Sequence, residues 1–153
     1  MTEIYGIIKG ETAKIAIVAA RFNSLVTTKL VAGAEMELTK HEVPADNVTV
    51  VWVPGALELS RVVKKVAATG KFDGIIALGA VVRGETSHYD FVCSETARGL
   101  TELSLQGPVP VMFGVLTTDN MEQALNRAGG KAGNKGNDCA NGILEMISLE
   151  LQL

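Results

Sequence analysis

One short segment, residues 79–91 (GAVVRGETSHYDF), carries most of the chemically useful side chains of this chain. It follows an apolar run that predicts a buried strand. The spacing of Ser87 and Asp90 fits a capping box, which predicts a helix with His88 in its first turn. Unpaired loop N–H groups at a helix N-terminus bind anions, and an imidazole transfers protons. We therefore expect an anionic substrate and acid–base chemistry here. The alternative is an ordinary connection with an exposed histidine.

Other unusual residues follow the other predicted strands. Phe22 and Asn23 come after the first strand, residues 54–58 (PGALE) after the second, and Phe113-Gly114 at the end of the fourth. In parallel sheets, ligands bind outside the carboxyl ends of the strands. These loops therefore predict one site along a single edge of a sheet.

Each candidate also has a structural explanation. Phe22 suits stacking on a planar ligand, or packing under its own helix. Glu58 suits a polyol or amine, or the dipole at the start of a helix. The Arg127 guanidinium suits bidentate binding of a phosphate, and the alternative is a cation that stabilises the C-terminus of a helix. Lys131 and Lys135 lie in a glycine-rich segment that suits anions, although solvated loop lysines are more frequent.

The motifs argue against several enzyme classes. Residues 79–84 have the glycine spacing of a phosphate-binding P-loop, but Glu85 stands where the lysine is needed, which argues against ATP hydrolysis. No G-x-G-x-x-G and no G-x-S-x-G occurs, which argues against dinucleotide redox chemistry and serine hydrolysis.

The elements that must position these residues alternate along the chain. Apolar runs predict strands at residues 14–20, 48–53, 74–82 and 109–115. Helical periodicity predicts helices at residues 24–41, 57–67, 89–105, 121–127 and 137–151. Nearly continuous apolar strands separated by helices indicate a parallel sheet covered on both faces. We therefore predict a single α/β domain, residues 1–153, with a flavodoxin-like three-layer sandwich around four parallel strands.

Composition restricts partners and location. A net charge of −3 gives no basic surface for nucleic acid, and no apolar run approaches the length of a membrane helix. The hydrophobic fraction of 47% is high for this size, which favours apolar surface buried between subunits. Cys93 and Cys139 lack partners at metal-ligand spacing, so we expect no metal and reduced thiols. With no recognisable signal peptide at the start, we expect a cytoplasmic protein.

Five blocks in order along the chain resemble the 6,7-dimethyl-8-ribityllumazine synthase family. They are ARFN (20–23), VPGALE (53–58), GAVVRGETSHYDFV (79–92), VMFGVLT (111–117) and AGGKAGNKG (128–136). The resemblance implies condensation of 5-amino-6-(D-ribitylamino)uracil with 3,4-dihydroxy-2-butanone 4-phosphate, without a metal or organic cofactor. Two alternatives are a flavodoxin-like module that binds a phosphorylated ligand, and a related riboflavin synthase. A protein that serves mainly as a compartment shell is a further one.

The same resemblance implies roles for individual residues. Phosphate would be held by the N–H groups of Glu85 and Thr86 together with Arg127, while His88 would be the general acid/base and Asp138 would orient it. The Glu85 carboxylate must then point to solvent, away from the phosphate. Phe22 would lie under the heterocycle with Asn23 as a nearby polar contact, and Val81 and Val82 would line the pyrimidine pocket through their backbone. The ribityl chain would be held by Ala56, Leu57 and Glu58, and Lys135 would be a cation that contacts a ligand.

The family's quaternary structure implies partners as well. Phe113 would come from a neighbouring subunit of a pentamer, and twelve pentamers would form a 60-subunit icosahedral shell, with riboflavin synthase as a further partner. The apolar segment 4–8 (IYGII) is too short for a core helix and suits an edge strand added to a neighbour's sheet.

Overall fold

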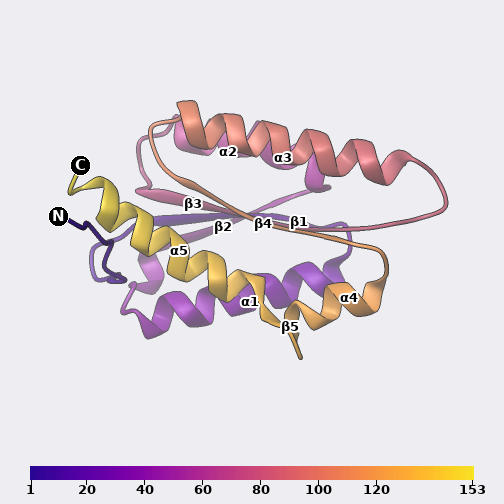
Figure 1. Cartoon of the computed structure of the whole chain (residues 1–153), viewed down its shortest axis with the longest axis horizontal. Coiled ribbons are helices and arrows are strands. Elements are labelled where there is room, and N and C mark those ends of the chain that lie inside the picture. The colour runs from indigo at the N-terminus through magenta and orange to yellow at the C-terminus, as the bar shows by residue number, and fades with distance from the viewer.

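The computed structural model describes residues 1–153 and has a parallel sheet between two layers of helices (Figure 1). The sheet has the strand order β2-β1-β3-β4, and every neighbouring pair is parallel. Its strands are β1 (Ile15–Ala20), β2 (Val48–Val53), β3 (Gly74–Val82) and β4 (Val111–Thr118). The predicted α/β fold with four parallel strands is confirmed.

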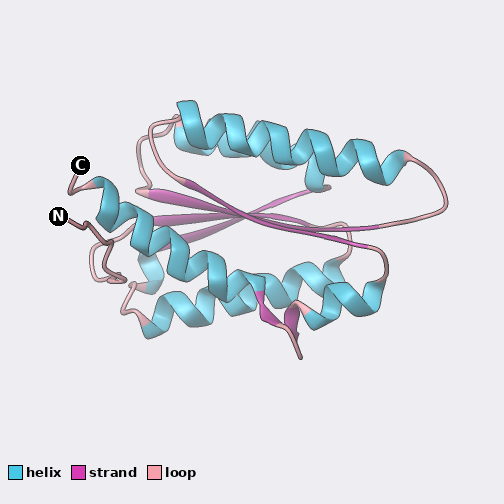
Figure 2. Cartoon of the chain, in the orientation of Figure 1, coloured by secondary structure: helices cyan, strands magenta, loops and turns pink.

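Helices cover both faces of this sheet (Figure 2). On one face lie α1 (Ser24–Lys40), α4 (Met121–Asn126) and α5 (Lys135–Glu150), and on the other α2 (Leu59–Ala67) and α3 (His88–Gln106). Short elements complete the chain: the 3-10 helices η1 (Ala45–Asn47) and η2 (Ala56–Glu58), and the strands β5 (Ala128–Gly130) and β6 (Gly133–Asn134). None of the helices combines the length and apolarity needed to cross a membrane.

The two-sided cover explains the apolar strands. All six residues of β1 are buried. Successive side chains of a strand point to opposite faces, so Ile15 and Ile17 pack with the α1 and α5 side, whereas Ala16 and Val18 pack with the α2 and α3 side. A strand buried on both faces requires apolar residues at every position.

The carboxyl end of β3 extends past its neighbour β1. Pairing between β1 and β3 ends at Ala19 and Leu78, whereas pairing between β3 and β4 continues to Val82 and Thr118. Residues 79–82 therefore have one unpaired edge. The chain also reverses its direction of winding here, since β2 and β3 lie on opposite sides of β1. This is the position at which parallel sheets bind ligands.

The fourth strand differs from the prediction. β4 ends at Thr118 rather than at residue 115, because Thr117 and Thr118 pair with Val81 and Val82. Phe113 is therefore the third residue of β4 and does not lie at its carboxyl end. The sequence-based placement of Phe113 along the same edge as the other loops is wrong.

Three local features were also missed or mispredicted. The hairpin β5–β6 was not predicted. Helix α5 begins at Lys135, two residues before the predicted start, since Asn134 Oδ1 accepts a hydrogen bond from Gly136 N at 2.8 Å. The capping box is wrong: α3 does begin at His88, but the Ser87 side chain makes no capping hydrogen bond.

The N-terminal segment is not a strand within this chain. Ile7 N donates to Ser148 Oγ at 3.0 Å, and Gln152 Nε2 donates to the Tyr5 carbonyl at 2.8 Å. These bonds hold the segment against the end of α5. Its apolar side chains stay largely exposed, with Tyr5 at 69% and Ile7 at 57%. Addition of this segment to a neighbour's sheet remains a prediction.

A carboxylate network joins α1 to α5 and gives a stability prediction. Glu37 has a side chain only 14% exposed. It accepts hydrogen bonds from Lys40 Nζ at 2.9 Å, Asn137 Nδ2 at 3.1 Å and Asn141 Nδ2 at 3.3 Å. Glu37→Ala removes all three bonds and leaves the two amides without an acceptor. We expect the free energy of unfolding, measured by urea denaturation, to fall by about 1–3 kcal/mol.

The pH dependence of that effect follows from the same contacts. The hydrogen bond from Lys40 lowers the pKa of Glu37 below its ordinary value. A lowered folded-state pKa contributes stability above the unfolded pKa, and that stability is lost as pH falls through the folded value. The difference between wild type and Glu37→Ala should therefore shrink in acid. Glu35→Ala, an exposed site on the same helix, is the control, and equal effects of the two substitutions would contradict the role of the network.

Candidate active site

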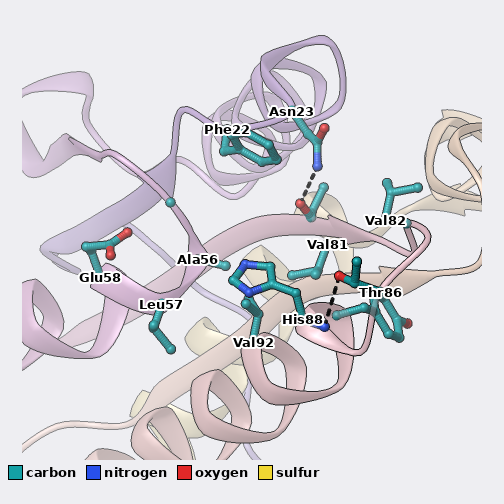
Figure 3. Close-up of a pocket in the computed structure, with 14 residues that line it drawn as sticks. Phe22, Asn23, Ala56, Leu57, Glu58, Val81, Val82, Thr86, His88 and Val92 are labelled. Atoms are coloured by element: carbon teal, nitrogen blue, oxygen red, sulfur yellow. Dashed lines mark hydrogen bonds between the residues drawn. The ribbon is translucent and has the colours of Figure 1, made fainter.

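A cavity of about 420 Å³ lies at the carboxyl ends of the central strands (Figure 3). Three loops contribute to it: those that follow β1, β2 and β3. Nine residues named from the sequence line it, namely Phe22, Asn23, Ala56, Leu57, Glu58, Val81, Val82, Thr86 and His88. Five others do not, namely Glu85, Phe113, Arg127, Lys135 and Asp138.

The loop after β1 presents an aromatic ring to the cavity. Phe22 is 71% exposed, which does not fit a ring packed under its own helix. Its backbone N–H donates to the Pro54 carbonyl at 3.0 Å. The next residue, Asn23, has a left-handed backbone with φ of 60°, and its Nδ2 donates to the Ala80 carbonyl at 2.8 Å. Asparagine tolerates this conformation better than most residues. Asn23 thus ties the loop to β3 and fixes the position of Phe22.

The loop after β2 forms η2 on the other side of the cavity. Ala56 is buried, whereas Leu57 is 49% exposed and Glu58 is exposed. Figure 3 shows the His88 ring pointing toward the segment that carries Ala56 and Leu57. The hydroxyl groups of a polyol need both acceptors and donors: the Glu58 carboxylate accepts hydrogen bonds, and backbone N–H groups donate them.

The end of β3 supplies an unpaired backbone edge. Val81 and Val82 are half-buried and line the cavity. They lie beyond the last β1 partner, so backbone groups on that side are available to a ligand. The carbonyl of Ala80 is already used by Asn23. A planar heterocycle with donors and acceptors along its edge matches such a strand edge.

The loop after β3 is a site for an anion. The N–H groups of Gly84, Glu85, Thr86 and Ser87 donate no hydrogen bond within the chain. They precede the first residue of α3, His88, whose own N–H lies 3.4 Å from Thr86 Oγ1. Free amides at a helix N-terminus attract negative charge. The imidazole of His88 is thus next to the place where an anion would bind.

The charges of the cavity are incomplete for a phosphate. Glu58 is the only charged carboxylate that lines it, and no lysine or arginine does. Glu85 is exposed and outside the lining, as the sequence argument required. A dianion bound here would meet amide groups but no cation from this chain.

The remaining named residues lie elsewhere. Arg127 is exposed at the end of α4, with Nη1 3.4 Å from the Gln123 carbonyl. Lys135 Nζ lies 3.6 Å from Asp138 Oδ2 at the start of α5. Phe113 is 42% exposed and lines a small hollow beside α3. Within one chain, the structure does not bring these four residues to the cavity.

Some residues that line the cavity had no individual role assigned from the sequence. Gly55, Ala80, Gly84, Tyr89 and Val92 also line the cavity. Burial raises the pKa of the Tyr89 hydroxyl, so it stays protonated near neutrality. Its position directly after His88 was the available signal. No group of three or more His, Cys, Asp or Glu side chains is placed to hold a metal ion.

Comparison with known proteins gives a consistent result. The family model described as 6,7-dimethyl-8-ribityllumazine synthase matches residues 12–150. The 6,7-dimethyl-8-ribityllumazine synthase of Pediococcus pentosaceus is 58% identical over 150 residues, which cover 98% of this chain and 96% of the relative. The protein of the same name from Levilactobacillus brevis is 57% identical over 153 residues, covering 100% and 98%.

Proposed function

The chain belongs to the 6,7-dimethyl-8-ribityllumazine synthase family, and we propose that the cavity at the carboxyl ends of its strands is one half of the active site. The reaction condenses 5-amino-6-(D-ribitylamino)uracil with 3,4-dihydroxy-2-butanone 4-phosphate in riboflavin biosynthesis. The products are the lumazine, phosphate and water. A flavodoxin-like binding module or a riboflavin synthase is not favoured, since both relatives carry the synthase name.

One observation carries the assignment of the site. A single cavity joins an exposed aromatic ring, an unpaired strand edge, four unpaired amides and an imidazole. These features match in turn the ring, the polar edge, the phosphate and the proton transfers of the two substrates. In this proposal Phe22 stacks on the pyrimidine, Val81 and Val82 bind its edge, and Asn23 holds Phe22 in place. The ribityl hydroxyls bind the segment Ala56–Glu58.

The chemistry asks mainly for positioning and proton transfer. The 5-amino group attacks the ketone and forms an imine with loss of one water, and phosphate is then eliminated. The ribitylamino nitrogen closes the ring on the remaining carbonyl carbon with loss of a second water. Holding two substrates in register is worth about 7–11 kcal/mol in favourable cases. His88 would accept and return protons at the reacting centre, while the amides of Glu85 and Thr86 hold the phosphate until it departs.

The other half of the site is proposed to come from a neighbouring subunit. The cavity lacks a cation, and Arg127 and Lys135 lie outside it on exposed positions. Phe113 likewise lies away from its own cavity. A head-to-tail contact between copies would bring these residues, together with Asp138, to the cavity of the next subunit. Such a contact closes into a ring when the rotation is right.

A pentameric ring is the assembly that we propose, and a 60-subunit shell of twelve rings is its extension. The exposed apolar segment at residues 4–8 would add to the edge strand β2 of a neighbour. A shell would also place riboflavin synthase, which consumes the lumazine, close to its source. We propose a cytoplasmic location because Cys93 and Cys139 are unpaired, as is usual for thiols in a reducing compartment.

The reaction is tested by absorbance. Mixing the purified protein with the two substrates should produce the lumazine chromophore faster than the substrates do alone. Riboflavin production from added lumazine would instead support the riboflavin synthase reading. No reaction, with tight binding of a phosphorylated ligand, would support the binding module.

Stacking on Phe22 gives a binding prediction. Phe22→Leu keeps an apolar side chain, whereas Phe22→Asp adds a charge beside the ring, so affinity for a lumazine analogue should fall in the order wild type, leucine, aspartate. The leucine variant should lose roughly threefold to tenfold, since an aromatic pair adds about 0.5–1.5 kcal/mol. Titration calorimetry measures the affinity. Unchanged affinity with a lower Tm in both variants would assign Phe22 to packing instead.

A further inference from the structure

Arg83 joins three elements beside the loop that follows β3. Its Nε donates to Asp119 Oδ1 at 3.2 Å, and its Nη1 lies 3.5 Å from Asp90 Oδ1. The guanidinium carbon lies 4.2 Å from the centre of the Tyr89 ring. The backbone N–H of Arg83 donates to the Thr118 carbonyl at 2.9 Å. One side chain thus connects the ends of β3 and β4 to the first turn of α3.

The loop between these anchors, residues 84–87, has little internal support. Its four N–H groups are unpaired, and the Ser87 side chain does not cap α3. The bonds it does take part in are from His88 N to Thr86 Oγ1 and from Asp90 N to the Ser87 carbonyl. A Cβ at Gly84 would meet nothing within 4 Å. The conformation of the loop therefore depends on what holds its two ends.

Arg83 is not itself placed as a phosphate ligand. It does not line the cavity, although Gly84, Thr86, His88 and Tyr89 do. Its guanidinium already faces two carboxylates, so the group of Arg83, Asp90 and Asp119 has a net charge of −1. That charge does not attract a dianion. Any contribution of Arg83 to phosphate binding has to pass through the shape of the loop.

We propose that Arg83 is a positioning residue for the phosphate-bearing substrate. By contacting Asp119 and Asp90, it holds the loop 84–87 in the conformation in which the N–H groups of the loop bind the phosphate. The inference rests on the proposed function of this cavity. An ordered loop spares the substrate the entropy of ordering it on binding. The planar guanidinium suits this task, since it contacts two carboxylates and an aromatic face at once, which a lysine does not do.

Steady-state kinetics with each substrate varied in turn tests this role of Arg83. Arg83→Ala should raise the KM for the butanone phosphate by about 10-fold or more and leave that for the pyrimidine within about twofold. Arg83→Lys keeps the positive charge, but its KM for the butanone phosphate should stay nearly as high as that of Arg83→Ala. Asp119→Asn should also raise the KM for the phosphate substrate, and weaken competition by inorganic phosphate. If charge alone mattered, Asp119→Asn would lower the KM for the phosphate substrate, because it removes a negative charge near the anion.

Arg98→Ala is the matched control. Arg98 lies on α3, the helix that also carries Asp90, and pairs with Glu95 and Glu102 outside the cavity. The proposal is overturned if Arg83→Ala behaves like Arg98→Ala, if Arg83→Lys restores wild-type kinetics, or if Asp119→Asn tightens inorganic phosphate. Should Arg83→Ala not fold, Asp119→Asn decides alone. Failure of the wild-type protein to form the lumazine would reject the proposed function. The affinities of wild type and variants for inorganic phosphate would still test the positioning role of Arg83.

Discussion

Replacing His88 by alanine is expected to slow turnover by roughly 10- to 10³-fold. His88 is the only titratable base that lines the cavity besides the Glu58 carboxylate, and it adjoins the four unpaired amides. The variant should fold and bind a lumazine analogue normally, because the His88 side chain is exposed and makes no hydrogen bond within the chain. Activity should not vanish, since positioning of the two substrates survives. Single-turnover absorbance gives the rate of the chemical step.

The only other histidine supplies the control. His41 lies in the network between α1 and α5, with Nε2 2.7 Å from Asn141 Oδ1 and 3.4 Å from Glu37 Oε1. His41→Ala should change stability and leave kcat near the wild-type value. If His88→Ala retained full activity, the imidazole would have no part in the mechanism. If it lost affinity for the analogue in proportion to its rate, the role would be binding rather than proton transfer.

The fold was predictable because burial on both faces forces a strong pattern. The runs at residues 14–20 and 74–82 are apolar at nearly every position, and glycine or proline interrupts the chain between elements. The end of β4 was not predictable from apolarity. Thr117 and Thr118 extend the strand because Val81 and Val82 offer backbone partners, and that pairing is a property of the assembled sheet.

The site was predictable only in part, for a similar reason. Loops after parallel strands meet at one edge, which is why Phe22, Leu57 and His88 were expected together and line one cavity. The hydrogen bond from Asn23 Nδ2 to the Ala80 carbonyl depends on the left-handed backbone of Asn23, which could not be predicted from the sequence. The contact of Arg83 with Asp119 spans 36 residues and follows from the register of β3 and β4.

The charges that line the cavity are the reason for proposing a site shared between subunits. A cavity lined by Glu58 and by no lysine or arginine would hold a phosphorylated substrate poorly, whatever its amides contribute. Hydrogen bonds to charged groups are worth about 1.5–3 kcal/mol, so a missing guanidinium corresponds to a loss of roughly 10- to 100-fold in affinity. Arg127→Ala should therefore raise the KM for the butanone phosphate by that factor and affect the pyrimidine much less. Equal weakening of both substrates would indicate a structural role for Arg127.

Mixing two impaired variants tests whether the cation reaches the cavity from a neighbour. When His88→Ala and Arg127→Ala subunits assemble together in equal amounts, about a quarter of the interfaces in a ring should pair an intact His88 with an intact Arg127. At a butanone phosphate concentration well below the KM of either variant, activity should then rise to about a quarter of wild type, well above the mean of the separate variants. If both residues served one cavity within the same chain, mixing would not increase the activity.

Light scattering on the same samples gives the mass of the assembly, which matters because complementation requires an oligomer. A monomer at micromolar concentration would exclude the shared site, and a dimer would exclude the ring. A pentamer mass would exclude only the shell.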